Sequence, residues 1–170
     1  MPRNIEIKAR AIDFARQSLL ARELGAREPA HLFQEDTFFD VPHGRLKLRD
    51  FGNGQGELIE YARENTCEPR ESRYSLVPTS NPNVLKHVLG NAIGVRAVVR
   101  KHRWVHKVGR SRIHLDRVES LGDFIEIEVV LDADESSDEG VRTVTELMTK
   151  LKIERSDLVE SAYVDMIPDA

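Results

Sequence analysis

The side chains best suited to chemistry are charged residues that alternate with aliphatic ones along several short segments. Glu126 and Glu128 are two residues apart in segment 124–131, and Glu6 and Lys8 have the same spacing near the start of the chain. Alternate residues of a strand point to the same side, so each pair presents its charges together. Paired carboxylates are typical ligands of hard divalent ions such as Mg²⁺ or Mn²⁺. The pattern therefore favours a divalent-ion site, although a single pair of this kind is commoner on a solvated strand edge.

Basic side chains follow the same alternation and outnumber the acidic ones. The basic positions are Lys8, Lys47, Arg49, Arg63, Arg70, Lys101, Arg103 and Arg112, and the acidic positions are Glu6, Asp116, Glu126 and Glu128. So many cations cannot share a pocket of low dielectric constant without an anion to balance them. A polyphosphate carries the required charge, and a divalent ion on the carboxylates would bridge them to its oxygens.

Strands and helices must position these residues. Hydrophobic periodicity, turn residues and capping residues predict strands at 4–10, 32–40, 45–50, 57–63, 73–77, 95–108, 110–118 and 124–131, a loop at 64–71, and helices at 13–24, 81–90, 136–151 and 157–166. The expected apolar stripe of the first helix includes Leu19, and that of the second includes Val84 and Val88. The chain is therefore expected to have an α+β fold.

The aliphatic rows of the strands decide where the charged rows point. For each strand alone, the usual arrangement turns the charged side to water. The helices, however, must bury their apolar stripes, and the aliphatic rows are the surfaces available to them. If helices cover the outside of a closed sheet, the charged rows point into its lumen. Trp104 alternates with Arg103, so it is expected to pack on the outer side.

Length and composition set further bounds. The 170 residues are expected to form one domain, 1–170, with 40% hydrophobic and 32% charged residues. A net charge of −4 argues against binding of nucleic acid through bulk positive charge. The single cysteine, Cys67, is expected to be an unreactive thiol. No segment has the roughly 20 apolar residues of a membrane span, so we expect a cytoplasmic protein with no membrane partner.

The sequence resembles the CYTH, or triphosphate tunnel metalloenzyme, superfamily, which includes class IV adenylyl cyclases and animal thiamine triphosphatases. The matching segments are NIEIK (4–8), QEDTFFD (34–40), GRLKLR (44–49), ELIEY (57–61), VRKHR (99–103), RIHLDRV (112–118), LGDFIEIE (121–128) and SAY (161–163). They follow the family order over nearly the whole chain, and the cyclase-type members are the most similar.

The resemblance implies a closed antiparallel barrel of eight strands, with a charged lumen and helices outside. It implies that Glu6, Glu126, Glu128 and Asp116 hold Mg²⁺ or Mn²⁺, and that Glu6 and Lys8 take part in catalysis. It also implies that a phosphate chain is bound by Lys8, Lys47, Arg49, Lys101, Arg103 and Arg112, and less securely by Arg63 and Arg70. The implied substrate is a small triphosphate such as ATP, tripolyphosphate or thiamine triphosphate.

Two departures from the family pattern affect the expected chemistry. Asn4 stands where the family has its first acid, so a second metal site is expected to be weaker or absent. Phe38 and Phe39 stand where some hydrolytic relatives have a tyrosine that pairs with the lysine corresponding to Lys8. A phenyl ring cannot help to deprotonate water, which argues against thiamine triphosphatase activity. His114 is expected to have a supporting role.

Three functions follow from these patterns. The first is a metal-dependent enzyme that cyclises a nucleoside triphosphate or hydrolyses a triphosphate. The second is a non-catalytic protein that binds a polyphosphate or nucleotide, and Asn4 is its main support. The third, processing of RNA 5′-triphosphates, is disfavoured by the acidic net charge. A homodimer is compatible with the sequence but not specified by it.

Overall fold

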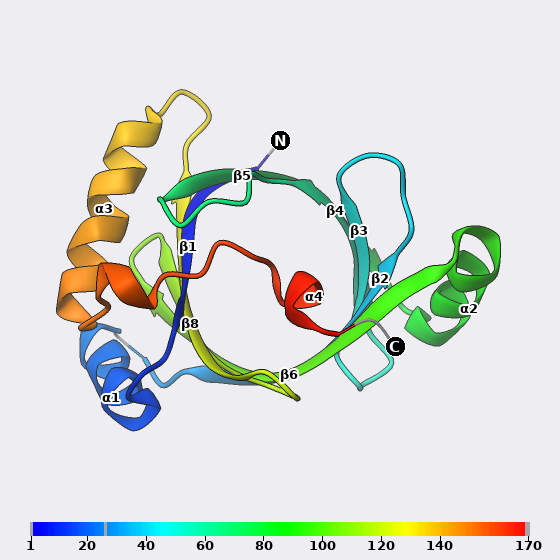
Figure 1. The fold of residues 1–170 in the computed structure, drawn as a ribbon, viewed down its shortest axis with the longest axis horizontal. Coiled ribbons are helices and arrows are strands. Elements are labelled where there is room, and N and C mark those ends of the chain that lie inside the picture. Colours follow the sequence, from blue (N-terminus) through cyan, green and yellow to red (C-terminus); the bar gives the residue numbers. More distant parts are fainter. Residues whose placement is uncertain (1, 26, 169–170) are drawn as a thin grey trace.

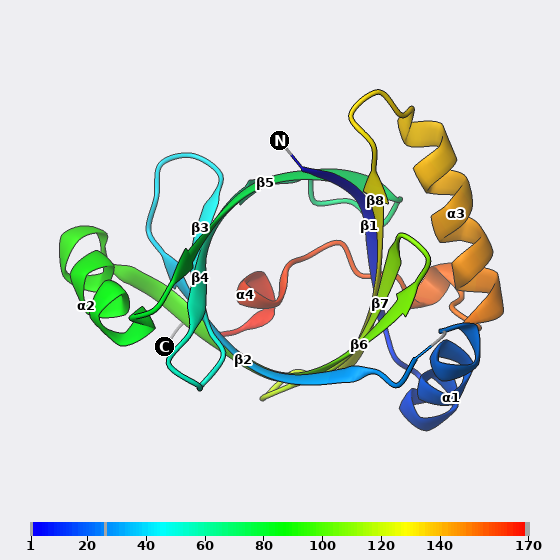
Figure 2. The ribbon, with the colours of Figure 1, turned by 180° about the vertical axis from the view of Figure 1, so that it is seen from behind.

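The computed structural model describes residues 2–25 and 27–168, and these form a closed antiparallel barrel with helices packed against one side and lying near its ends (Figures 1 and 2). Around the barrel the described strands follow the order β1-β5-β4-β3-β2-β6-β7-β8. The strands are β1 (Arg3–Arg10), β2 (Ala30–Phe39), β3 (Arg45–Asp50), β4 (Gly56–Ala62), β5 (Arg70–Thr79), β6 (Val95–Val108), β7 (Ser111–Val118) and β8 (Gly122–Leu131). The helices are α1 (Phe14–Leu24), α2 (Pro82–Ile93), α3 (Ser137–Lys150), the 3₁₀ turn η1 (Arg155–Asp157) and α4 (Tyr163–Met166).

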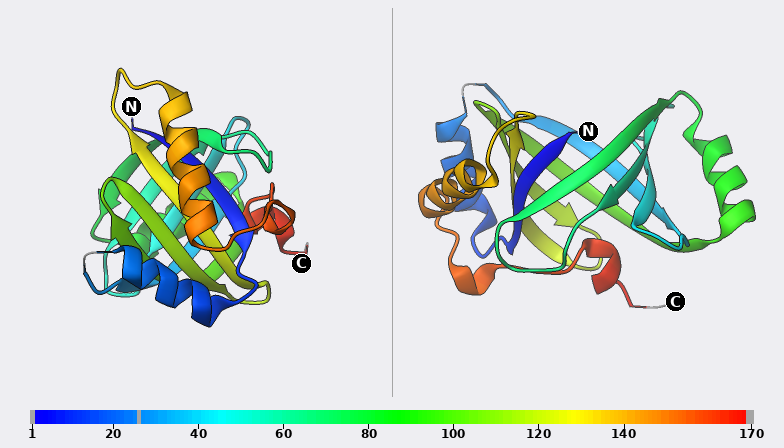
Figure 3. Two further views of the ribbon diagram at one scale, coloured as in Figure 1. Left: turned by 90° about the vertical axis from the view of Figure 1, so that its left-hand side faces the viewer. Right: turned by 90° about the horizontal axis from the view of Figure 1, so that it is seen from above.

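Helices α1 and α3 cover the aliphatic outer face formed by β1, β7 and β8 (Figure 3). The buried outward-facing residues are Ile5, Ile7, Ile113, Leu115, Ile125, Ile127 and Val129, which pack with Val144, Leu147 and Leu151. Trp104 also lies on the outer side, where its ring meets that of Phe14 at 5.7 Å. The prediction that helices bury the aliphatic rows is confirmed for this half of the barrel, so the opposite faces of these strands are turned to the lumen.

Helix α2 does not cover the barrel, contrary to the expectation. It lies beside one end of the barrel near β2 and β3 (Figure 1). Val84 and Val88 of its expected stripe are 55% and 52% exposed. In α1, Leu19 is exposed, whereas Gln17 is buried and its amide donates a hydrogen bond to the carbonyl of Leu151 at 3.3 Å. A helical period alone does not reveal which stripe a neighbouring element will cover.

Two predicted segments differ most from the structure. Strand β5 begins at Arg70 within the expected loop, because Arg70 pairs in register with Glu6 of β1. The expected helix 157–166 is interrupted, because residues before α4 bond to the end of β1 instead. The amide of Val159 donates to the carbonyl of Lys8 at 2.8 Å, and this extended backbone cannot also be helical.

The contact between α3 and the barrel leads to a stability prediction. A Cβ atom at Gly140 would lie 2.6 Å from Cγ1 of Ile5 and 2.8 Å from Cδ2 of Leu131. We expect Gly140→Ala to lower the free energy of unfolding by about 1–3 kcal/mol, measured by urea denaturation. Gly90→Ala in α2 is the control, because its nearest atom is a side-chain carbon of Val95 at 3.3 Å. Equal losses in the two variants would contradict close packing of α3.

Candidate active site

The inward-facing residues of the eight strands enclose a cavity of about 450 Å³ in the lumen. Most of the predicted site residues line it, namely Glu6, Lys8, Lys47, Arg49, Arg63, Lys101, Arg103, Arg112, Glu126 and Glu128. His114 and Asn4 line it as well. Arg70 and Asp116 are buried but are not among the residues that form its wall. The alternation in the sequence thus placed the charged rows on the correct side of the sheet.

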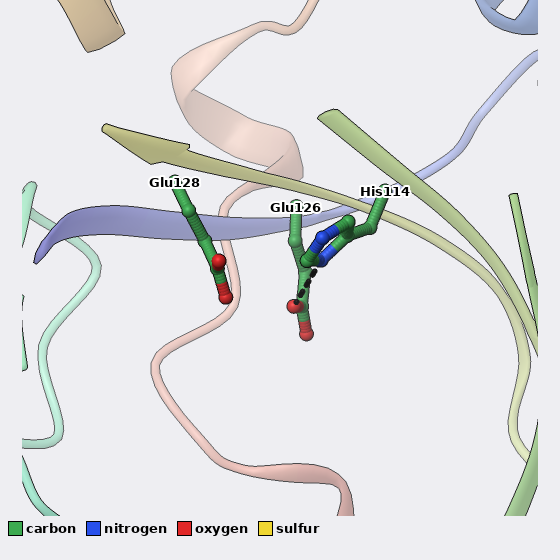
Figure 4. A group of neighbouring side chains, drawn as sticks. All are labelled: His114, Glu126 and Glu128. Carbon is green, nitrogen blue, oxygen red and sulfur yellow. Dashed lines mark hydrogen bonds and ion pairs between the residues drawn. The ribbon is translucent and has the colours of Figure 1, made fainter. Parts of the chain in front are cut away.

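Strands β7 and β8 bring His114, Glu126 and Glu128 together, and we call these three residues the acidic wall (Figure 4). His114 lies opposite Glu126 in the register, and one ligand atom from each residue falls within 4.8 Å of the others. The two glutamates extend from β8 in the same direction, with the histidine ring beside Glu126. This is the grouping among the described residues that could hold a metal ion. The sequence pointed to both carboxylates but gave His114 only a supporting role.

Cations neutralise both carboxylates of the acidic wall. Glu126 lies 3.5 Å from Nζ of Lys8 and 3.1 Å from Nη2 of Arg103, and Glu128 lies 3.0 Å from Nη2 of Arg112. Burial alone would raise the pKa of Glu126, but Arg103 and Lys8 hold that pKa well below its ordinary value. For Glu128, the effects of nearby His114 and Arg112 outweigh burial, so its pKa is also lowered. Both groups are therefore anionic at neutral pH.

Glu6 is near the acidic wall but already has partners. It lies opposite Glu128 in the pairing of β1 with β8. Its carboxylate accepts a hydrogen bond from Arg63 at 2.8 Å and lies 3.7 Å from Nε of Arg70. Arg70 also donates to the backbone carbonyl of Glu160 at 2.9 Å. Arg70 thus joins β5 to the C-terminal segment, a structural contact different from the phosphate binding that the resemblance implies.

Asp116, expected as a metal ligand, is fully engaged with protein groups. Its carboxylate accepts two hydrogen bonds from Arg103, both at 2.7 Å, and one from the hydroxyl of Tyr163 at 2.7 Å. Burial opposes its ionisation, but Arg103 lowers the pKa of Asp116 below its ordinary value. A metal ion would have to displace three charge-assisted or buried hydrogen bonds. This geometry favours a role for Asp116 in orienting Arg103 and Tyr163.

A second charged group lies on β2, β3 and β6. Lys47, Arg49 and Lys101 all contact the carboxylate of Asp36, and we call these three residues the cationic cluster. Sequence reasoning assigned the cations but missed Asp36. Asp36 alternates along 32–40 with Gln34 and Phe38, and all three side chains line the lumen. Burial lowers the pKa of Lys101 to about 7 and that of Lys47 to about 8.

The C-terminal segment covers one end of the lumen, where α4 lies within the outline of the barrel (Figures 1 and 3). Nζ of Lys8 lies 3.6 Å from the centre of the Tyr163 ring, and Nζ of Lys101 lies 5.4 Å from it. Burial raises the pKa of the Tyr163 hydroxyl well above its ordinary value, so it stays protonated and donates to Asp116. The sequence gave no periodic signal for this residue, because it follows an irregular segment.

The structure is thus a closed, tunnel-like barrel whose lumen presents three side chains that could hold a metal ion and a separate group of buried cations. The family comparison agrees with this class, since the CYTH domain model matches residues 2–163, and the chain belongs to the CYTH domain family. A comparison with curated proteins returned no match. No helix among residues 2–25 and 27–168 has the length and apolar character needed to cross a membrane.

Solved structures share the fold at low sequence identity. The PH1012 protein from Pyrococcus horikoshii OT3 is similar with a TM-score of 0.86 and 24% identity, covering 97% of this chain and 99% of that one. A “putative adenylate cyclase” from Vibrio parahaemolyticus has a TM-score of 0.78 and 18% identity, covering 96% of each chain. The “putative adenylyl cyclase” HpAC1 from Hippeastrum, whose structure is described as revealing a dominant triphosphatase activity, has a TM-score of 0.67 and 15% identity, covering 95% and 91%.

The buried lysine of the cationic cluster leads to a pH prediction. Unfolding restores Lys101 from a pKa of about 7 toward 10.5, so the unfolded chain binds more protons between these values and stability rises with pH there. Lys101→Met removes this contribution. Between pH 7 and 9 we expect its free energy of unfolding to rise less steeply than that of the wild type, by up to about 1.4 kcal/mol per pH unit. Lys107→Met, at an exposed position of β6, should leave the slope unchanged. Parallel curves for wild type and Lys101→Met would contradict the lowered pKa.

Proposed function

We propose that this protein is a divalent-metal-dependent enzyme that acts on a small organic triphosphate. The observation that carries the proposal is the opposition of the acidic wall and the cationic cluster across one enclosed cavity. Phosphoryl and nucleotidyl transfer depend mainly on positioning and on neutralisation of the charge on the phosphates. The structural similarity to proteins named for adenylate cyclase and triphosphatase activity supports the same class of substrate.

The residues of the acidic wall fit a divalent ion such as Mn²⁺ or Mg²⁺. Two carboxylates and an imidazole supply donors, and the side-chain oxygen of Asn4 is buried in the same lumen without a hydrogen-bond partner. An imidazole donor suits Mn²⁺ better than Mg²⁺, which prefers oxygen ligands. When bound, such an ion would neutralise phosphate charge and activate the attacked phosphorus. Because Lys8, Arg103 and Arg112 already compensate the carboxylates, we expect the ion to bind together with the triphosphate.

Lys8 has the properties of a proton acceptor. Burial lowers its pKa to about 7, and Nζ lies 3.5 Å from Glu126 on the lumen wall. A lysine that is partly neutral at physiological pH can receive the proton of an attacking hydroxyl. Glu6 assists indirectly, since it holds the guanidinium of Arg63 at the cavity wall. Attack by a ribose 3′-hydroxyl on the α-phosphorus would release pyrophosphate and a cyclic nucleotide, whereas attack by water would hydrolyse the chain.

The end of the lumen away from the C-terminal segment favours a substrate with an organic group. Its wall includes apolar side chains from the start of β2, from near the ends of β5 and β6, and from the residue after β3. We call these side chains the apolar collar. The collar consists of Ala30, Leu32, Phe51, Leu76 and Val105. Leu76 is 41% exposed there. An apolar collar next to a charged interior suits a base or a thiazole ring better than a bare phosphate chain. ATP or thiamine triphosphate therefore fits better than tripolyphosphate.

A binding protein without turnover is the second candidate, and the side chain of Asn4 favours it. The unpaired oxygen of Asn4 supplies no charge where the family has an acid. If the chain binds triphosphates tightly but does not convert them, Asn4→Glu should restore turnover. Turnover by the wild-type chain would exclude this candidate.

The central test is an activity assay with a matched pair of variants. The wild type, supplied with Mn²⁺ or Mg²⁺, is expected to convert ATP, with products identified by chromatography and thiamine triphosphate assayed in parallel. Glu128→Gln should lose activity by about 100-fold or more, because it removes a proposed ligand. Glu119→Gln makes the same change at an exposed turn and should retain activity. An inactive wild type, or equal activity of the two variants, would refute the proposed enzymatic function.

The apolar collar leads to a second prediction for this site. Leu76→Ala should weaken ATP binding about 3- to 10-fold, as expected from the lost apolar contact, and leave tripolyphosphate binding unchanged in calorimetric titrations. Val77→Ala is the control, because Val77 is the outward-facing neighbour and is 59% exposed. A similar loss for ATP and tripolyphosphate in Leu76→Ala would mean that the collar does not contact the organic group.

A further inference from the structure

One carboxylate oxygen gathers the whole cationic cluster. Oδ2 of Asp36 lies 3.3 Å from Nζ of Lys47, 2.8 Å from Nη2 of Arg49 and 3.2 Å from Nζ of Lys101. The other oxygen, Oδ1, accepts a hydrogen bond from Nε of Arg49 at 2.8 Å. The Asp36 side chain lines the lumen and is 2% exposed. The cations come from β2's two neighbours in the barrel, β3 and β6.

This arrangement matches the way in which a phosphate oxygen is bound. Three nitrogen donors on one anionic oxygen, with a forked guanidinium contact, is the pattern that arginine and lysine form around phosphate. Without Asp36, three cations would lie together in a buried space, which is costly unless another anion enters. Asp36 therefore stands in for an anion that the same cations are suited to hold.

We propose that Asp36 is a resident counter-ion that competes with a bound phosphate group for Lys47, Arg49 and Lys101. The inference rests on the proposed function, since it assumes that the lumen takes a phosphate chain. In the empty lumen Asp36 keeps the cations paired and ordered. When a phosphate group binds, the cations exchange contacts with Asp36 for contacts with phosphate, so part of the binding free energy is lost. The same competition favours release of a short phosphate product, which makes Asp36 a determinant of affinity and selectivity.

The test is the sign of the change in affinity when the charge of Asp36 is removed. Asp36→Asn keeps the shape and one acceptor oxygen. The titrations use tripolyphosphate and orthophosphate without metal at pH 6, which is below the pKa values of Lys101 and Lys47 in the wild type, about 7 and about 8. We expect both ligands to bind about tenfold more tightly to Asp36→Asn, because a negative charge next to the phosphate is gone. The melting temperature should also rise more on ligand addition than in the wild type.

Glu35→Gln is the matched control. Glu35 is the preceding residue of β2, and its carboxylate also pairs with a lysine and an arginine, Lys86 at 2.8 Å and Arg100 at 2.9 Å. These contacts lie outside the lumen, so the same loss of charge should leave phosphate affinity unchanged. If the affinity of Asp36→Asn is lower than or equal to that of the wild type, Asp36 orients the cations instead of competing, and the inference is wrong.

A double variant keeps the inference testable if Asp36→Asn does not fold. Asp36→Asn combined with Lys47→Met removes one charge of each sign and leaves the lumen balance unchanged. We expect it to bind tripolyphosphate more tightly than Lys47→Met alone, because Arg49 and Lys101 then face no resident anion. Equal affinity of these two variants would overturn the inference. An inactive wild type in the assay with ATP and metal would instead refute the proposed function.

Discussion

Buried positive charge that must be balanced within the lumen is the constraint on which this structure depends. The lumen brings lysines and arginines from β1, β3, β6 and β7, and Arg63 just after β4, into one space, and each predicted cation on its wall contacts a carboxylate. Water cannot solvate so many charges there, so the fold supplies fixed counter-ions. Among these carboxylates, Glu126 and Glu128 lie beside His114 on the acidic wall. Asp36 contacts only cations of the cationic cluster, and Asp116 contacts Arg103 and Tyr163.

The outer layer of helices stabilises the barrel that holds these charges. Helices α1 and α3 bury the aliphatic rows of β1, β7 and β8, the same strands that carry the acidic wall on their other face. Close contact of Gly140 with Ile5 fixes α3 directly over β1. The strands of the acidic wall therefore lie on the helix-covered half of the barrel, where packing can hold their charged groups in place. Strand β3, which supplies Lys47 and Arg49, is not part of this outer core.

The sequence predicted the closed fold and most of the lumen, because alternation of charged and aliphatic residues determines the face of each strand. Lys47, Arg49, Lys101, Arg103, Glu126 and Glu128 all lie where that alternation places them. What it could not predict were pairings between distant segments. The bond from Tyr163 to Asp116 joins residues far apart in the chain, and the grouping of His114 with two glutamates depends on the register of β7 and β8. The same alternation could have identified Asp36 as an inward-facing residue. It could not have shown that the apolar stripe of α2 is exposed, because periodicity does not specify which element covers a helix.

The C-terminal segment covers one end of the barrel, and Ala162 and Tyr163 of this segment line the lumen. If the lumen takes a triphosphate, as we propose, this cover leaves the opposite end as the route by which the guest would enter and leave. Such an arrangement would suit a short chain better than a long polymer drawn through the barrel.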